Sequence, residues 1–202
     1  MSIFRGERIK LEIYGGSHEA VISVRMTGIP RGTQLDREAL GRFMSRRAPG
    51  RDKFSTPRVE ADAVEFLSGV SDDTFTGEEI HAIIRSSNQR SRDYSQFADM
   101  PRPSHADYVA KVKYGDSVNM AGGGPFSGRM TAPLCIAGAI ALSILEKKGI
   151  TIGAHLHSVG DAHDVPFDSV ALSTPQLQEL KLKPFPALSS AAKVEMQAAI
   201  LN

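Results

Sequence analysis

The 202-residue sequence contains no tryptophan and only one cysteine, and its formal net charge at pH 7 is only +1. A single cysteine excludes a disulfide within these residues, and the small net charge gives no field that would attract nucleic acid or a membrane surface. The N-terminal residues lack the apolar core of a signal peptide, and no later segment is expected to be long enough to span a bilayer. These features predict a cytoplasmic protein with neither nucleic-acid nor membrane partners.

A glycine-rich run, AGGGPFSGRMTAP at 121–133, is the most informative stretch of the sequence. Three successive glycines at 122–124 permit positive φ angles and close approach of a ligand to the backbone amides. Ser127 and Arg129 follow, and Pro133 stands where a long apolar helix is expected to begin. Free amides, a helix N-terminus and a guanidinium together predict an anion site. The alternative is a flexible turn before a buried helix, because neither a P-loop nor a Rossmann spacing is present.

Hydrophobic periodicity predicts an α+β fold in which an antiparallel sheet packs on a long buried helix. Apolar residues alternate with polar ones over 9–13 and again over 22–26, and the short connection between them predicts an antiparallel hairpin. Asp36 is positioned to cap a helix that ends at Pro49-Gly50. Further strands are predicted around 64–66, 80–84 and 152–156, and further helices at 131–148, from 174, and from about 188 onward. We expect residues 1–202 to form a single domain.

Two histidines are candidates for proton transfer, because an imidazole is the natural donor near neutral pH. His18 lies at the tip of the predicted hairpin, and His105 follows two prolines, with Asp107 placed to orient its ring. Each histidine alone is also compatible with an ordinary surface position. His155 and His157 are interpreted as the polar, solvated face of the predicted strand at 152–156, since two ligands are too few for a metal site. No metal site is predicted.

A basic segment from Arg46 to Lys53 is dense enough to bind a phosphate or carboxylate. The alternative is a solvated helix end, because cations are favoured near a helix C-terminus. Cys135 lies in the apolar run after the glycines, where a buried and unreactive thiol is expected.

Several motifs, in order along the whole chain, resemble those of chorismate synthase. The hairpin tip GGSHE resembles the family's GESHG, and SRRAPGRDKFSTPR resembles its arginine-rich segment ending in S/T-T-x-R. SSNQRSRDYS resembles NTDQRSxDYS, and PRPSHADY resembles RPGHADY. The glycine run is similar to RGGGRxSxRxTA. Members of the family are nearly twice as long, so the resemblance implies the N-terminal half of such a protein, and half of the family's β-α-β sandwich.

The resemblance implies a lyase of the shikimate pathway, acting in aromatic amino-acid biosynthesis. Chorismate synthase removes phosphate from 5-enolpyruvylshikimate 3-phosphate by a 1,4-elimination and needs reduced FMN without net redox change, with NADPH as a candidate reductant. By the same resemblance His18 would protonate the leaving phosphate and His105 would serve the flavin. Arg46 and Arg129 would bind substrate or other anions, and the expected cofactor-binding residues are Arg47, Lys53, Pro125, Phe126 and Ser127. The family also implies a homotetramer.

Departures from the family pattern fall on the motifs themselves. Glu19 replaces a glycine beside His18, Ser104 replaces the glycine before His105, and Ala121 and Pro125 stand where arginines are usual. Each lost charge-assisted contact is worth about 1.5–3 kcal/mol of binding free energy. The alternative reading is therefore a degenerate, noncatalytic relative that acts as a binding or assembly module.

Overall fold

The computed structural model describes residues 2–48, 50, 53–54, 60–86 and 100–201. The chain divides into two compact units. Unit 1 comprises residues 1–50 and 57–141, and unit 2 comprises residues 51–56 and 142–202. The single domain expected over residues 1–202 stays a prediction.

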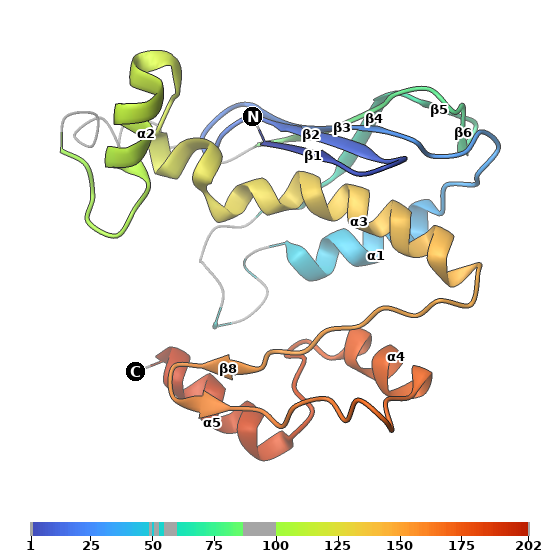
Figure 1. The fold of residues 1–202 in the computed structure, drawn as a ribbon, viewed down its shortest axis with the longest axis vertical. Coiled ribbons are helices and arrows are strands. Elements are labelled where there is room, and N and C mark those ends of the chain that lie inside the picture. Colours follow the sequence, from blue (N-terminus) through green and yellow to red (C-terminus); the bar gives the residue numbers. More distant parts are fainter. Residues whose placement is uncertain (1, 49, 51–52, 55–59, 87–99, 202) are drawn as a thin grey trace. The chain divides into compact units, whose positions relative to one another are not determined.

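A five-stranded antiparallel sheet forms the frame of unit 1, with the strand order β1-β2-β3-β7-β4 (Figure 1). The predicted hairpin is confirmed: its antiparallel register runs from the pair Lys10 and Thr27, at the open end, to the pair Tyr14 and Ser23, next to the tip. An N-terminal edge strand was not predicted from the sequence. The strands are β1 (Ser2–Arg5), β2 (Lys10–Tyr14), β3 (Val21–Thr27), β4 (Val64–Ser68) and β7 (Ile80–Arg85).

Alternating side chains of the two central strands supply the apolar face of the sheet. Ile22, Val24 and Met26 of β3 are at most 2% exposed and pair with Ile84, Ala82 and Ile80 of β7. The helices α1 (Arg37–Arg47) and α3 (Thr131–Glu146) lie on one face of this sheet (Figure 1). The Asp36 carboxylate caps α1 by accepting a hydrogen bond from the Ala39 amide at 2.8 Å, as predicted. The predicted α+β fold is confirmed.

Helix α3 is apolar nearly all round because it lies in the core. Together with the three residues before it, α3 forms the segment Gly128–Glu146, whose mean hydropathy of 1.6 over 18 residues meets the length and composition of a membrane span. By length and composition, the expectation that no segment would be long enough to span a bilayer is therefore wrong. Ile136 and Ile140 are at most 4% exposed, which is typical of the core helix of a folded domain. It is the one such helix found in the part of the chain that the structure describes.

Shorter elements of unit 1 follow the main strands and lead into α3. A small ribbon of β5 (Val70–Ser71) and β6 (Thr74–Phe75) turns at Asp72 and Asp73, both with positive φ. Helix α2 (Asp107–Tyr114) follows the His105 segment, and the 3₁₀ turns η2 (Gly115–Ser117), η3 (Ala121–Phe126) and η4 (Gly128–Met130) connect it to α3.

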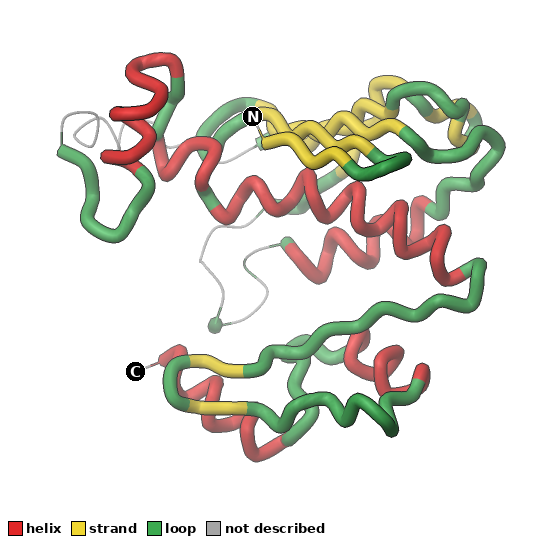
Figure 2. The backbone as a smooth tube through the Cα atoms, in the orientation of Figure 1, coloured by secondary structure: helices red, strands yellow, loops and turns green. Residues whose placement is uncertain are grey.

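Unit 2 contains a two-stranded ribbon and two helices, separated by long loops (Figure 2). Strand β8 (Ser158–Val159) pairs with β9 (Ala162–His163), and the helices are α4 (Thr174–Leu182) and α5 (Ser190–Leu201). Its core comprises Ala187, Ala192 and Met196, with Leu156, Val159, Ala162 and Phe185 packed against them.

The predicted strand at 152–156 is wrong, because the chain becomes a strand only at Ser158. The Leu156 amide donates to the carbonyl oxygen of Pro186 at 2.8 Å. Pro184 and Pro186 of that neighbouring segment have no N–H groups, so they cannot return the hydrogen bonds that a continuous strand ladder requires.

Candidate functional site

The glycine loop, residues 121–128, adopts a conformation that requires its glycines. Gly122, Gly123 and Gly124 have φ angles of 62°, 92° and 51°, in the region that side chains disfavour. The loop leads through η4 into α3, as the sequence predicted. Ser127 caps η4, because its hydroxyl accepts a hydrogen bond from the Arg129 amide at 3.2 Å. The loop therefore holds a fixed turn immediately before the N-terminus of a buried helix.

The hairpin tip that carries His18 packs directly on this loop. A Cβ atom added at Gly122 would lie 2.5 Å from Nε2 of His18 and 3.1 Å from the Ser17 hydroxyl. The Ser17 amide also donates to the Gly124 carbonyl at 3.2 Å, and Ser17 is buried. Two motifs that lie about 100 residues apart in the sequence thus meet, and the missing side chain of Gly122 provides the room for the imidazole.

Several amides of the glycine loop donate hydrogen bonds to neighbouring residues, so the expectation of free amides does not hold at these positions. The Gly123 amide donates to the Met120 carbonyl at 2.9 Å, and the Ser127 amide donates to the Gly124 carbonyl at 3.3 Å. The Ala121 amide is bonded to the Asn119 side chain at 3.0 Å. Those hydrogen bonds stabilise the loop conformation. An anion at this loop would therefore depend more on side-chain cations and His18 than on these amides.

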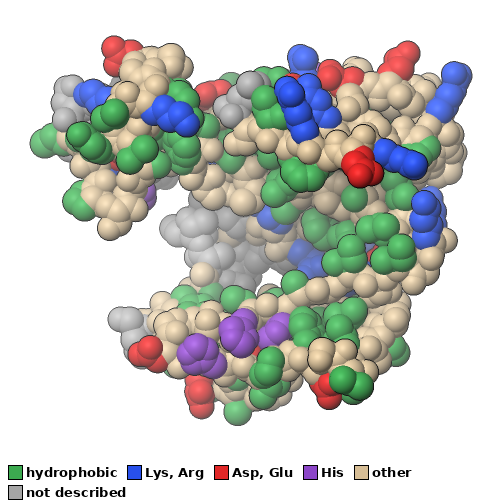
Figure 3. Space-filling view, in the orientation of Figure 1, with side chains coloured by type: hydrophobic (Ala, Val, Ile, Leu, Met, Phe, Trp, Pro, Cys, Tyr) green, Lys and Arg blue, Asp and Glu red, His purple; other side chains and the backbone are tan. Residues whose placement is uncertain are grey.

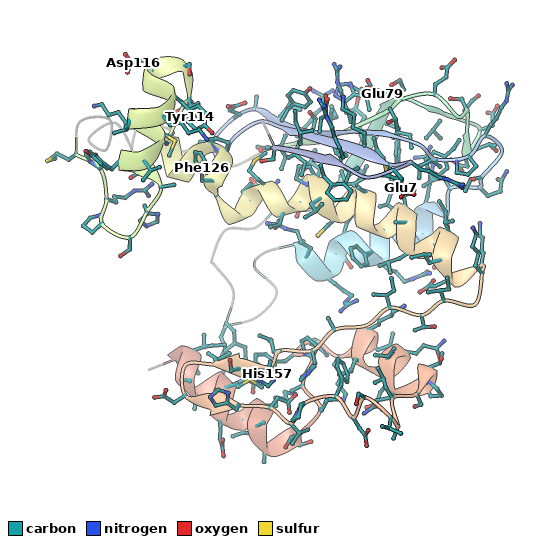
Figure 4. The ribbon with its side chains drawn as sticks, viewed as in Figure 1. Glu7, Glu79, Tyr114, Asp116, Phe126 and His157 are labelled. Carbon is teal, nitrogen blue, oxygen red and sulfur yellow. The ribbon has the colours of Figure 1, made fainter. Side chains whose placement is uncertain are left out.

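Two aromatic rings stand exposed beside the loop. The Phe126 side chain is about half exposed, and its ring centroid lies 6.3 Å from that of Tyr114 at the end of α2 (Figure 4). Pro125 and Ser127 flank Phe126 and are half-buried. The pair presents an aromatic surface at the end of the glycine loop, and such a surface suits a planar ring system.

Arg129 and Arg47 lie in a buried network with two carboxylates that sequence reasoning missed. The two oxygens of Asp62 accept hydrogen bonds from the two arginines, from Nη1 of Arg47 at 2.6 Å and from Nη1 of Arg129. A Glu60 oxygen lies 2.6 Å from Nη2 of Arg129. Nothing in the alternating sequence EADA distinguishes Glu60 and Asp62 from exposed strand residues, so no sequence signal identified them.

The other predicted cations are more accessible. Arg46 is exposed at the end of α1. Lys53 belongs to unit 2, where its ammonium group lies 5.3 Å from the ring centroid of Phe54. The Phe54 ring in turn contacts Phe185 edge-to-face, with centroids 6.1 Å apart. The arginine-rich segment therefore contributes Arg46 and Arg47 to unit 1 and Lys53 to unit 2. Residues 55–59 and the motif at 86–95, except Ser86, lie outside the described residues.

The His105 segment is held by a different interaction from the one predicted. The Asp107 carboxylate binds Arg102, accepting hydrogen bonds from its Nε at 2.7 Å, its Nη2 at 2.9 Å and its backbone amide at 3.1 Å. The Arg102 guanidinium holds the pKa of Asp107 below its ordinary value, although burial opposes that shift. His105 itself is exposed, and Ser104 before it has a φ of 62°. Asp107 thus shapes the loop, and in the described part of the chain the His105 ring donates no hydrogen bond to it.

His155 is an interior residue of unit 2, which corrects the prediction of a solvated position. Its side chain is 7% exposed, and its Nδ1 lies 2.9 Å from an oxygen of Asp164. The same carboxylate accepts hydrogen bonds from the amides of Leu188 at 2.6 Å and Ser189 at 2.9 Å, just before α5. His157 is exposed, as predicted.

Histidine side chains gather on unit 2 (Figure 3), where the His157 ring lies about 6 Å from those of both His155 and His163. Within the described ranges, no group of three or more His, Cys, Asp or Glu side chains is arranged to hold a metal ion.

Comparison with known proteins gives a consistent family assignment. The sequence model of the chorismate synthase family matches residues 9–202. The chain is 42% identical over 163 residues to a chorismate synthase from Lancefieldella parvula, covering 80% of this chain and 43% of that protein. It is 41% identical over 155 residues to the one from Korarchaeum cryptofilum, covering 77% of this chain and 43% of that protein. It is 39% identical over 191 residues to that of Flavobacterium psychrophilum, covering 94% and 52% respectively.

The fold comparison agrees with the sequence comparison. A crystal structure of chorismate synthase matches 96% of this chain and 52% of its own chain, with a TM-score of 0.70 and 22% sequence identity. At that identity the match establishes the fold alone. The chain spans about half the length of the curated relatives that it matches.

Proposed function

The chain belongs to the chorismate synthase family, and we propose that it carries the phosphate-eliminating part of such an enzyme. The reaction is the 1,4-elimination of phosphate from 5-enolpyruvylshikimate 3-phosphate, which gives chorismate for aromatic amino-acid biosynthesis. The observation that supports this proposal best is the contact between His18 and Gly122, because it joins the family's histidine motif to its glycine motif.

In this proposal His18 is the general acid. The carbon–oxygen bond to phosphate breaks, its electron pair leaves with the phosphate, and the His18 imidazolium supplies a proton to the departing oxygen. The ring carbon at the other end of the allylic system loses a proton, and the electrons of that carbon–hydrogen bond form the second ring double bond. The reduced flavin would supply the group that takes up this proton. General acids of this kind accelerate a reaction by about 10²–10⁴-fold. Arg46 and Arg129 would neutralise the phosphate and carboxylate groups of the substrate, which is a polyanion.

Reduced FMN is the cofactor implied by the family, which uses it without net redox change. The exposed rings of Phe126 and Tyr114 would fit a flavin ring, since they form an aromatic surface at the same glycine loop whose Gly122 contacts His18. Pro125 and Ser127 would border that surface, Arg47 and Lys53 would bind the anionic groups of the cofactor, and His105 would serve the ring from its exposed loop. NADPH is the proposed source of reducing equivalents. A homotetrameric assembly and a cytoplasmic location complete the proposal.

We further propose that these 202 residues do not form chorismate alone. The chain spans about half of its relatives, and the cations of the glycine loop region are already paired with carboxylates. Completion of the flavin pocket would then require residues beyond those described.

The test is chorismate formation by the full-length protein and by the 202-residue chain, each supplied with reduced FMN and the enolpyruvyl substrate. Phosphate release is followed alongside chorismate absorbance. We expect turnover by the full-length protein only. Turnover by the 202-residue chain would contradict the requirement for further residues. A folded full-length protein that neither binds FMN nor releases phosphate would support the alternative of a noncatalytic relative.

A further inference from the structure

Among the described residues, four ionisable side chains of balanced formal charge form a largely buried network next to the glycine loop. Asp62 is fully buried and bridges Arg47 to Arg129, and Glu60 contacts the far side of the Arg129 guanidinium. The side chains of Glu60 and Arg129 are 2% and 4% exposed. The formal charges of the two guanidiniums and the two carboxylates cancel. Such pairing offsets the free-energy cost of burying charged groups in a protein interior.

The network lies where it can control the glycine loop. Arg129 is in η4, two residues after Ser127, and Arg47 is the last residue of α1. The thiol of Cys135, one turn into α3, lies in the same electrostatic surroundings. Burial raises the pKa of Cys135, with Asp62 adding to the rise and Arg47 opposing it. The network therefore joins α1 to the segment between the loop and α3.

The two carboxylates hold Arg129 in unequal ways. Asp62 makes aligned hydrogen bonds to both arginines, and it does so with a strained φ of 47°. The contact between Glu60 and Arg129 is close, at 2.6 Å, but its angles are not those of a hydrogen bond. Nε of Arg129 is also buried without a hydrogen-bond partner in the described part of the chain. Arg129 thus retains donor capacity that a better-placed oxyanion would satisfy.

We propose that Glu60 is an internal substitute for the ligand anion, holding Arg129 in the free protein and yielding it to a phosphate group. Asp62 is then the positioning residue that keeps Arg47 and Arg129 aligned throughout. The inference rests on the proposed function only in taking Arg129 as an anion-binding residue. Because Arg129 is buried, an incoming anion reaches its guanidinium only by displacing what already contacts it.

This arrangement makes Glu60 a determinant of specificity. A monocarboxylate ligand offers Arg129 the same charge that Glu60 already provides, so the exchange gives it little advantage. A phosphate monoester carries a charge of about −1.5 to −2 at pH 7 and three acceptor oxygens. Only a ligand of that kind gains enough to replace Glu60. The network therefore selects phosphate over carboxylate.

The test compares inorganic phosphate with acetate as probes in the full-length protein. Glu60→Gln removes the charge while nearly preserving shape, and Glu65→Gln is the matched control, because Glu65 pairs with Arg85 on the exposed face of β4. We expect Glu60→Gln to bind phosphate about tenfold more tightly than the wild type and to gain measurable acetate binding. Glu65→Gln should leave both affinities unchanged. Alkylation of the Cys135 peptide, quantified by mass spectrometry, gives a second readout of phosphate occupancy.

An unchanged or weakened phosphate affinity in folded Glu60→Gln overturns the inference. If that variant does not fold, Glu60→Asp keeps the charge but shortens the reach, and its phosphate affinity must rise for the inference to stand. The proposed function and the inference about Glu60 can be contradicted independently of each other. Tighter phosphate binding by Glu60→Gln in a protein that forms no chorismate contradicts the proposed function alone. Chorismate formation with an unaltered phosphate affinity in Glu60→Gln contradicts the inference alone.

Discussion

The two units each bury an aspartate, but they compensate its charge in different ways. Asp62 of unit 1 opposes two guanidiniums, whereas Asp164 of unit 2 accepts hydrogen bonds from backbone amides and contacts a histidine. The backbones differ as well. All four non-glycine residues with positive φ in the described ranges belong to unit 1, namely Asp62, Asp72, Asp73 and Ser104.

This difference indicates that the surroundings of Asp62 are suited to binding ligands, whereas Asp164 serves to stabilise the fold of unit 2. A carboxylate that faces side-chain cations, as Glu60 does beside Asp62, can be exchanged for an external anion, because the cations and the second carboxylate remain when it leaves. A carboxylate that holds the first amides before a helix has no such substitute, since its removal leaves backbone donors unsatisfied. Backbone strain is typical of sites whose geometry serves function. We therefore expect substitutions around the glycine loop of unit 1 to alter catalysis or binding, with or without a change in stability, and substitutions around Asp164 to alter stability alone.

The largest expected effect is a loss of turnover from a substitution in unit 1. A similar loss from a substitution in unit 2 would contradict the distinction between the two units. His18→Ala in the full-length protein should lower kcat by about 10²–10⁴-fold, because the leaving phosphate loses its proton donor. His155→Ala should lower stability while the folded fraction keeps its turnover, and the exposed His157→Ala should change neither. The measurements are steady-state chorismate formation and denaturant unfolding. Equal losses of kcat in all three variants would show that His18 has no special role.

Next in size is the cost of opening the charge network. Asp62→Ala should lower the free energy of unfolding by about 3–5 kcal/mol, since it leaves buried guanidiniums uncompensated. Glu65→Ala, which removes an exposed partner of Arg85, should cost no more than about 1 kcal/mol. Chemical denaturation followed by a probe in unit 1 measures both values. A cost for Asp62→Ala no larger than that of the control would mean that the network is open to water.

The sequence alone predicts much of unit 1 because its signals are local. The alternation at 9–13 and 22–26, the cap at Asp36 and the apolar run after Pro133 each depend on neighbouring residues, and each is confirmed. Family motifs also indicated the candidate residues His18 and Arg129. Their contact partners are a different matter, because they come from distant parts of the chain.

The misses share one physical cause, which is long-range pairing. Asp62 and Arg129 are 67 residues apart, and nothing near either one indicates that both are buried. His155 looked like a strand-face residue because periodicity cannot show that Asp164 and the start of α5 would enclose it. The strand expected at 152–156 was wrong for the same reason, since its neighbour turned out to contain two prolines.

A smaller, pH-dependent effect is expected from Asp164. Burial raises the pKa of Asp164, but the amides of Leu188 and Ser189 and the His155 ring outweigh burial, so the net pKa lies below the ordinary value. A depressed pKa contributes stability above the unfolded-state pKa of about 3.9, and that stability is lost as the pH falls through the folded-state value. Asp164→Asn should cost about 1–3 kcal/mol at pH 7, and the difference from wild type should shrink toward pH 3. If the difference in unfolding free energy between wild type and Asp164→Asn does not depend on pH, the stabilisation by Asp164 comes from the shape of its side chain and not from its charge.

The smallest expected effect concerns the strained backbone before His105. Ser104 holds a φ of 62°, which glycine adopts without a steric penalty, so Ser104→Gly should raise the free energy of unfolding by up to about 1 kcal/mol. Ser45→Gly in the exposed part of α1 is the matched control and should lower it by a similar amount, because glycine disfavours a helix interior. Thermal unfolding midpoints of the two variants should therefore move in opposite directions. A fall in both midpoints would show that the turn at Ser104 is relaxed, and that strain in unit 1 is confined to the buried network and the β5–β6 ribbon.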